Sequence, residues 1–179
     1  MVVNLDDTTS LTFTKKEELV MEIGVIGLGK MGANMVARLL QGGHSVVAYD
    51  INETSVQAVE KLGAIGARTL DNLIEKLQPS RSIWVMVRSG NIIKETIKSV
   101  ADRLSPGDTI IDGGNSNYKD SVLRGAELVE QGIHFIDVGT SGGIWGKTEG
   151  YSMMVGSKKE IVERHRPIFE TLAPSPEKG

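Results

Sequence analysis

The chain contains no cysteine and few aromatic or histidine residues. Its 179 residues include two tryptophans, three tyrosines, three phenylalanines and three histidines. The lack of cysteine excludes disulfide bonds, thiolate metal ligands and a cysteine nucleophile. The histidines, His44, His134 and His165, are isolated and show no metal-ligand spacing. We therefore expect no metal site.

The charge balance and hydropathy point away from nucleic acids and membranes. With 20 basic and 23 acidic residues the net charge is -3, and the basic residues form no stripe of the kind that binds a nucleic acid. No apolar run approaches the length needed to span a membrane. We therefore expect neither a nucleic acid nor a membrane as partner.

Residues 1–20 differ from the rest of the chain. They carry Asp6 and Asp7 and lack a continuous apolar core, so they do not resemble a secretory signal, and we expect a cytoplasmic location. We interpret them as an extension outside the fold. Met21 directly precedes the first predicted strand, so a translation start at Met1 and one at Met21 both stay open.

Residues 21–179 have the length of one domain, here expected to bind a dinucleotide. Their pattern alternates between strand and helix periods, which predicts an α/β fold with a doubly wound, mostly parallel sheet of the Rossmann type. Asn52 and Asp71 are the expected N-caps of the two helices that follow residue 50. Beyond residue 50 we expect helices at 52–62, 71–77, 92–104, 121–131 and 158–171, and strands at 82–87, 109–111, 133–138 and 151–155.

The stretch 21–50 carries the main functional signal. An apolar strand, the pattern Gly27-x-Gly29-x-x-Gly32 opening a helix, a second apolar strand and Asp50 follow one another. This order is the fingerprint of a dinucleotide-binding βαβ unit. A glycine-rich turn without a ligand is the weaker alternative.

Each part of the fingerprint has a separate task. Gly27 permits a tight turn, Gly29 lets the backbone approach a pyrophosphate, and Gly32 lets the helix pack closely on the strand. The helix that begins near Lys30 directs free N–H groups at the phosphates. Asp50 is expected to accept hydrogen bonds from ribose hydroxyls and to repel a 2′-phosphate, which favours NAD over NADP.

Three polar loops follow predicted strands farther along the chain, at 88–90, 112–116 and 139–143. Their glycine, serine and asparagine content is also typical of ordinary turns. However, ligands of such sheets bind at the carboxyl ends of the strands, where all three loops are expected. We therefore take them as candidate parts of a binding site.

These loops also carry a family resemblance. The segments GVIGLGKMGANM, IDGGNSNYKDS and FIDVGTSGGIWGKTEGYSMMVG stand in this order, and together they resemble the decarboxylating 6-phosphogluconate dehydrogenases of the β-hydroxyacid dehydrogenase superfamily. The acid-terminated segment YDIN is similar to the shorter, NAD-preferring branch. The segment DGGNS separates the chain from the 3-hydroxyisobutyrate dehydrogenases, which share the glycine fingerprint.

The resemblance implies contacts for each loop. Asp50 would hold the ribose, Val87 and Arg88 would lie by the nicotinamide half, and Asn115 would sit between cofactor and substrate. Arg88 replaces the lysine, proline or histidine expected of the family, so a contact with a cofactor phosphate and a position in solvent both stay open. The pyrophosphate would be held by Gly27, Leu28, Gly29, Lys30, Met31 and Gly32. The sugar acid would be bound by Asn115, Ser141, Gly142 and Gly143.

The resemblance also marks what these residues lack. The family's general base is a lysine on a long helix beyond the nucleotide domain, and the chain ends at APSPEKG, before that element. Lys147 and Lys178 do not match that lysine, and we interpret both as surface residues. We therefore expect no catalytic residue in the chain, cofactor binding without turnover, and no C-terminal helical domain, through which full-length members oligomerise.

The resemblance implies that the parent enzyme oxidises 6-phosphogluconate with NAD and releases carbon dioxide. The product would be ribulose 5-phosphate, in the pentose phosphate pathway or in gluconate utilisation. Two alternatives stay open. The chain could be the NAD-binding domain of another β-hydroxyacid dehydrogenase, of the 3-hydroxyisobutyrate type, or a non-catalytic nucleotide-binding fragment.

Overall fold

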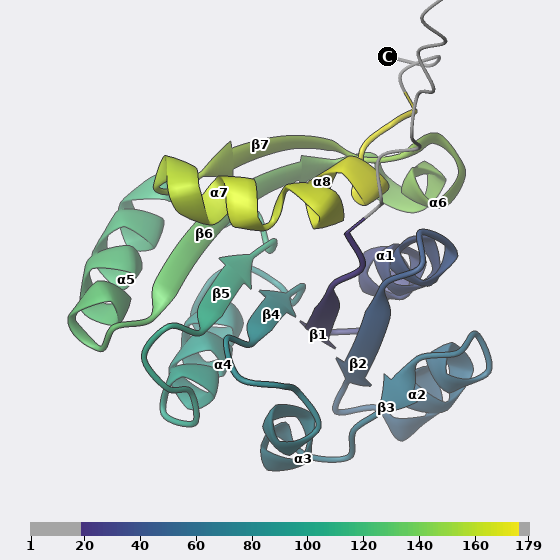
Figure 1. Cartoon of the computed structure of the whole chain (residues 1–179), viewed down its shortest axis with the longest axis horizontal. Helices are drawn as coiled ribbons and strands as arrows, with labels where there is room; N and C mark the ends of the chain where they lie inside the picture. Colours follow the sequence, from purple (N-terminus) through teal and green to yellow (C-terminus); the bar gives the residue numbers. More distant parts are fainter. Residues whose placement is uncertain (1–18, 176–179) are drawn as a thin grey trace, which may run out of the picture.

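The structure is a computed structural model that describes residues 19–175. Residues 1–18 of the expected extension, and Lys178, lie outside the described residues. Within the described range, a seven-stranded sheet lies between two layers of helices (Figure 1). No helix in this range is long and apolar enough to cross a bilayer.

Strands and helices alternate along most of the chain, as the sequence pattern predicts, but the strand at 65–66 and the short helices at 143–149 were not predicted. The strands are β1 (Glu22–Ile26), β2 (Ser45–Tyr49), β3 (Ile65–Gly66), β4 (Ser82–Val85), β5 (Thr109–Asp112), β6 (His134–Ser141) and β7 (Ser152–Gly156). The helices are α1 (Lys30–Gln41), α2 (Glu53–Glu60), α3 (Leu70–Glu75), α4 (Asn91–Ala101), α5 (Tyr118–Glu130), the 3-10 turn η1 (Gly143–Trp145), α6 (Gly146–Glu149), α7 (Lys159–Arg164) and α8 (Arg166–Leu172).

The sheet has the strand order β3-β2-β1-β4-β5-β6-β7. All neighbouring strands are parallel except β6 and β7, which are antiparallel. The chain runs outward from β1 to one edge and then from β4 to the other, so the strand order reverses between β1 and β4. This topology confirms the predicted doubly wound, mostly parallel sheet of the Rossmann type, and such sheets bind ligands at this reversal.

Both faces of the sheet are covered by helices, which explains the continuous apolar runs of its strands. Because successive strand side chains point to opposite faces, Trp84 joins one apolar core while Ile83 and Val85 join the other. The first core contains side chains of α1, α2, α7 and α8, and the second contains side chains of α3, α4 and α5 (Figure 1).

Two details of the predicted helices are wrong. Asp71 is not the cap of α3, because the Thr69 hydroxyl accepts the Asn72 N–H at 3.0 Å and Asp71 pairs with Arg103 at 2.8 Å. The predicted helix over 158–171 is divided into α7 and α8 by a turn at position 165. Pro167 lies at the start of α8 and has no N–H to continue the hydrogen bonds of α7.

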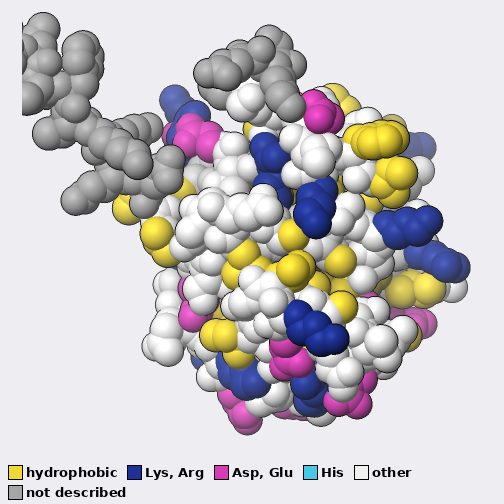
Figure 2. Space-filling model, turned by 90° about the vertical axis from the view of Figure 1, so that its right-hand side faces the viewer, with side chains coloured by type: hydrophobic (Ala, Val, Ile, Leu, Met, Phe, Trp, Pro, Cys, Tyr) yellow, Lys and Arg dark blue, Asp and Glu magenta, His cyan; other side chains and the backbone are white. Residues whose placement is uncertain are grey.

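The surface that can be seen in Figure 2 carries charges of both signs. This view shows the side on the right of Figure 1, where α1, α2 and α6 lie. Basic and acidic side chains are interspersed there with apolar ones, and no continuous basic stripe crosses this face.

Candidate functional site

The glycine loop between β1 and α1 has the geometry of a phosphate-binding turn. Gly27 has φ +92°, which residues with a Cβ rarely adopt, and its N–H donates to the Tyr49 carbonyl at 3.0 Å. A Cβ on Gly27 would overlap the Met86 carbonyl, and one on Gly32 would overlap the Gly27 carbonyl. A Cβ on Gly29 would meet nothing within 4 Å. The open space at Gly29 therefore fits the approach of a pyrophosphate.

The amino end of α1 is free to receive an anion. Gly29 is its N-cap residue, no side chain caps the helix, and its first turn contains no acidic residue. The first N–H groups of a helix, here those of Lys30, Met31 and Gly32, have no acceptor within the helix. Their partial positive charge is therefore available to a phosphate.

Asp50 lies beside this loop, at the carboxyl end of β2. Its Oδ2 atom accepts the Leu28 N–H at 2.6 Å, and its Oδ1 atom accepts the Asn52 N–H at 2.8 Å. These two bonds fix the orientation of the carboxylate. Each oxygen keeps a further lone pair that can accept a ribose hydroxyl.

A pocket of about 580 Å³ lies at this edge of the sheet, and we call it the cofactor pocket. It brings together five of the residues predicted for cofactor binding: Gly27, Gly29, Asp50, Val87 and Arg88. Its other lining residues are Ile26, Tyr49, Ile51, Leu70, Met86, Ile92, Glu95, Thr96 and Ser99. The pocket thus joins the glycine loop and the end of β2 to α4.

The α4 side of the cofactor pocket was missed by the sequence analysis. Ile92 lines this side and is 52% exposed, and Ile51, after β2, is 95% exposed. The pocket-lining residues of α4 also include Glu95 and Ser99. Ile92, Glu95 and Ser99 have the spacing of one helix face. This spacing, and the position of Ile51 directly after Asp50, are the two features of the sequence that could have identified this side of the pocket.

The buried acid Asp112 holds the backbone and side chains of the DGGNS loop. Asp112 is fully buried, and its Oδ1 atom accepts the Gly114 N–H at 3.0 Å. Its Oδ2 atom accepts the Ser116 hydroxyl at 2.7 Å and the Arg124 guanidinium at 2.5 Å. Asp112 therefore fixes the path of the loop that carries Asn115.

Asn115 connects the two loops predicted to bind the substrate. It has φ +54°, a conformation that asparagine tolerates better than most residues. Its side-chain oxygen accepts the Thr140 N–H at 2.8 Å, and its Nδ2 atom donates to the Thr140 carbonyl at 3.0 Å. The clamp places Asn115 next to the exposed loop of Ser141, Gly142 and Gly143. The structure therefore brings together the residues predicted for the substrate.

Tyr151 supports this second loop, and no sequence signal in the motifs identified it. The residue is fully buried, and a Cβ added to Gly142 would lie 3.0 Å from its Cδ1 atom. A Cβ on Gly146 would overlap its ring. The loop also contacts α1, because the Asn34 side chain donates to the Ile144 carbonyl at 3.3 Å. The loop of Ser141, Gly142 and Gly143 therefore rests on the same helix that begins at the glycine turn.

Lys147 is exposed on α6, which agrees with its interpretation as a surface residue. Its backbone carbonyl accepts Arg38 Nη1 at 3.4 Å. None of the residues predicted for the site lines another cavity among the described residues, which we call the α5 groove.

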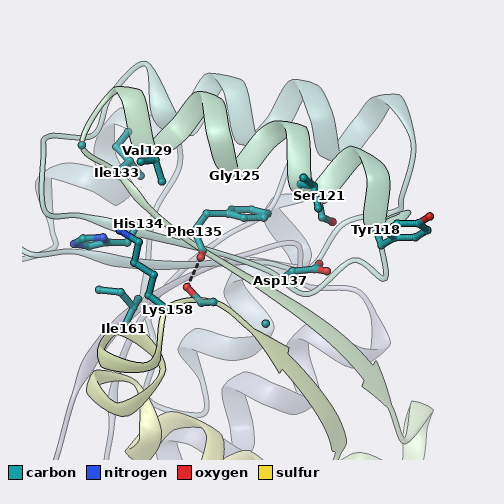
Figure 3. Close-up of a pocket in the computed structure, with 14 residues that line it drawn as sticks. Tyr118, Ser121, Gly125, Val129, Ile133, His134, Phe135, Asp137, Lys158 and Ile161 are labelled. Atoms are coloured by element: carbon teal, nitrogen blue, oxygen red, sulfur yellow. Dashed lines mark hydrogen bonds between the residues drawn. The ribbon is translucent and has the colours of Figure 1, made fainter.

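The α5 groove has a volume of about 560 Å³ and lies between α5 and β6 (Figure 3). Its walls include Val129, Ile133 and Phe135, and Asp137 lies near Ser121 at one end. Burial, above all, raises the pKa of the Asp137 carboxyl, and Asp112 adds to this effect while Ser121 opposes it. The groove therefore holds a carboxyl group whose ionised form is disfavoured.

Comparison with known families gives one match over most of the chain. The family described as the NAD binding domain of 6-phosphogluconate dehydrogenase matches residues 22–176. This range contains every residue predicted for the site.

Relatives match most of this chain but much less of their own length. YqeC of Bacillus subtilis, provisionally named a 6-phosphogluconate dehydrogenase, is 43% identical over 86% of this chain and 51% of its own. The NAD(+)-dependent decarboxylating enzyme of Haloferax volcanii is 38% identical over 88% of this chain and 52% of its own. The NADP(+)-dependent decarboxylating enzyme of Bacillus subtilis is 38% identical over 85% of this chain and 33% of its own. The chain thus spans between a third and about half of these relatives.

Solved structures of two dehydrogenase types share the fold. The 6-phosphogluconate dehydrogenase of Plasmodium falciparum superposes with a TM-score of 0.80 at 27% identity, over 88% of this chain and 35% of its own. The 3-hydroxyisobutyrate dehydrogenase of Mycobacterium tuberculosis also has a TM-score of 0.80, at 25% identity, over 87% of this chain and 53% of its own. Backbone similarity alone therefore does not separate the two substrate classes.

Proposed function

Because the chain belongs to the family of the NAD-binding domain of 6-phosphogluconate dehydrogenase, we propose that it binds NAD as the cofactor half of an enzyme that oxidises 6-phosphogluconate. The observation that carries this proposal is the placement of Asp50 beside the open approach to Gly29. A carboxylate held by two backbone N–H groups suits a ribose, and the glycine loop suits the pyrophosphate attached to it.

The pocket geometry supports one orientation of the dinucleotide. The pyrophosphate would lie over Gly29 and the amino end of α1, with the adenosine ribose on Asp50. The adenine would lie farther along the pocket, between Ile51 and Ile92, whose exposed apolar surfaces it would cover. Covering these side chains would contribute on the order of 25 cal/mol per Å² of apolar surface removed from water.

NAD is the cofactor that we propose, and Asp50 is the reason. Relatives of this chain include both NAD(+)-dependent and NADP(+)-dependent enzymes, so family membership leaves the choice to the residues of the pocket. The carboxylate of Asp50 would lie beside the 2′ position of the bound ribose. A 2′-phosphate there would meet a fixed negative charge.

The substrate would bind where the Asn115 clamp joins the two loops. The hydroxyl of Ser141 and the backbone N–H groups of Gly142 and Gly143 are neutral donors on an exposed loop. Such donors can hold a carboxylate and orient a carbinol carbon without competing for its proton. Bound NAD would supply the acceptor for the hydride, and loss of carbon dioxide would give ribulose 5-phosphate.

We further propose that these 179 residues bind the cofactor without turnover. The family's base lysine has no counterpart among them, and a missing general base forfeits roughly 10²–10⁴-fold in rate. Purified chain mixed with NAD and 6-phosphogluconate should therefore show no NADH absorbance above the background without protein. Steady NADH formation would contradict this part of the proposal.

Calorimetric titration of the chain with NAD and with NADP tests the cofactor site. We expect NAD to bind more tightly than NADP. Asp50→Asn keeps one side-chain acceptor for the backbone but removes the charge, and should weaken NAD binding about tenfold, the value of one charge-assisted hydrogen bond. The same variant should reduce the ratio of NAD affinity to NADP affinity. Absence of NAD binding, or tighter binding of NADP, would overturn the assignment.

Substrate class is tested by saturation-transfer NMR on the NAD-saturated chain. We expect transfer to 6-phosphogluconate but not to 3-hydroxyisobutyrate, because the DGGNS loop carries Asn115 to the substrate side. Asn115→Asp keeps the size of the side chain but removes the donor to Thr140, and should abolish the transfer. Transfer to 3-hydroxyisobutyrate alone would favour the second dehydrogenase class.

A further inference from the structure

The cofactor pocket contains one basic and two acidic side chains, and two of the three are free. Asp50 is bonded to two backbone N–H groups. Arg88 and Glu95 also line the pocket, and within residues 19–175 the side chain of neither makes a hydrogen bond or an ion pair. Both charges are therefore available to whatever occupies the pocket.

The fold directs Glu95 to the pocket. The residue lies in the middle of α4, whose Ile93, Ile97 and Val100 are buried in the core. Glu95 lies on the other side of the helix and is exposed. Lys98, one turn farther on, is paired with Asp102 at 2.9 Å and so does not neutralise Glu95.

Arg88 by itself would favour the wrong cofactor. A guanidinium group is a strong ligand for phosphate, and NADP differs from NAD by a 2′-phosphate on the ribose that Asp50 would hold. The resemblance alone puts Arg88 by the nicotinamide half, but its side chain lines the same pocket as Asp50. An unopposed Arg88 would therefore attract that phosphate. The NAD preference would then depend on Asp50 acting against Arg88.

We propose that Glu95 is a second determinant of NAD preference, because its charge opposes the attraction of Arg88 for a 2′-phosphate. The inference rests on the proposed binding of NAD in this pocket. With Glu95 present the three side chains carry a net charge of about −1. A doubly negative 2′-phosphate would therefore have to enter a negatively charged pocket. The interaction acts through solvent, so salt should weaken it.

The test compares four chains, namely the unsubstituted protein, Glu95→Gln, Arg88→Gln and the double variant, by calorimetric titration with NAD and NADP at low salt. Glu95→Gln should raise NADP affinity about three- to tenfold and change NAD affinity less than about twofold, as expected for one partly screened charge. Arg88→Gln should lower NADP affinity. The double variant should bind NADP less than about twofold more tightly than Arg88→Gln alone, because the Arg88 charge that Glu95 opposes is absent from both.

Glu130→Gln is the matched control, because Glu130 is exposed on α5 and does not line the pocket. It should leave both affinities unchanged, and moderate salt should reduce the effect of Glu95→Gln. The inference is overturned if Glu95→Gln leaves the ratio of NADP affinity to NAD affinity unchanged. It is also overturned if Glu130→Gln changes this ratio equally, or if Glu95→Gln changes it equally in the chain that lacks Arg88. A chain that binds no NAD would overturn the proposed function, and the inference with it. Normal NAD binding with an unchanged ratio would overturn the inference alone.

Discussion

The cofactor pocket and the α5 groove are hollows of nearly equal size, about 580 and 560 Å³, but they are built from different elements. The pocket joins strand ends, a glycine turn and a helix, and its acid Asp50 accepts two backbone N–H groups. The groove lies along α5 and β6 and reaches α7 at Ile161, and burial raises the pKa of its acid Asp137. Volume alone therefore does not distinguish a binding site in this molecule.

The same contrast exists between two neighbouring acids of the sheet. Asp112 of β5 and Asp137 of β6 are partners in the strand register. Asp112 is bonded to a backbone N–H, a hydroxyl and a guanidinium, whereas burial disfavours the ionised form of Asp137. The difference shows that an acid organises a loop only where donors converge on it. Three substitutions test the differences between the two hollows and between these two acids.

The largest effect is expected from Asp112→Ala. Arg124 is only 11% exposed at its side chain, and removing its partner would leave a buried, uncompensated charge. Breaking such a pair costs about 3–5 kcal/mol, so the free energy of unfolding measured in urea should fall by that amount. Arg124→Ala/Asp112→Ala should recover part of the loss. A stability loss similar to that of Asp137→Ala would refute the distinction between the two acids.

A smaller effect on stability, with a large one on binding, is expected from Gly32→Ala. Its Cβ would overlap the Gly27 carbonyl, and forcing atoms into such a space costs about 1–3 kcal/mol. Both the melting temperature and NAD affinity should decrease. Gly29→Ala is the control, because its Cβ meets nothing within 4 Å; it should keep the melting temperature and weaken NAD binding alone. Equal melting temperatures for the two variants would contradict the geometry of the turn.

The smallest effect is expected from Asp137→Asn in the α5 groove. The folded-state pKa of Asp137 is raised above its ordinary value of 3.8, so its contribution to stability is present at lower pH and is lost as the pH rises through the folded pKa. The neutral amide of Asp137→Asn does not ionise, so the variant does not lose this stability as the pH rises. The variant should therefore become slightly more stable than the unsubstituted chain above that pKa, by less than about 0.5 kcal/mol because the group is only partly buried and solvent screens its charge.

Urea unfolding of both chains at a series of pH values measures this difference. The gap between the two chains should widen as the pH rises and then level off. NAD affinity should be the same in both, since Asp137 does not line the cofactor pocket. A gap that widens as the pH falls would mean that the ionised carboxylate is stabilised in the folded state.

The strand and helix pattern could be predicted from the sequence because local periodicity encodes it. Errors arose where a short-range competition decided the outcome, as when Thr69 rather than Asp71 capped α3. The turn between α7 and α8 was missed although Pro167 signals it. The glycine fingerprint and Asp50 were predictable for the same local reason, since a strand, a turn and a helix place them within 24 residues of one another.

Most of the strands and helices, the glycine turn and the acid at the end of β2 follow from the sequence, because neighbouring residues set each of these. Long-range packing, in contrast, sets the clamp between Asn115 and Thr140, 25 residues away, and the position of Tyr151 against the loop of Gly142. It also decided that α4 turns Glu95 toward the pocket of Asp50. These contacts depend on strand order and on the rotation of helices against the sheet, which arise from packing of the whole core and not from any short segment.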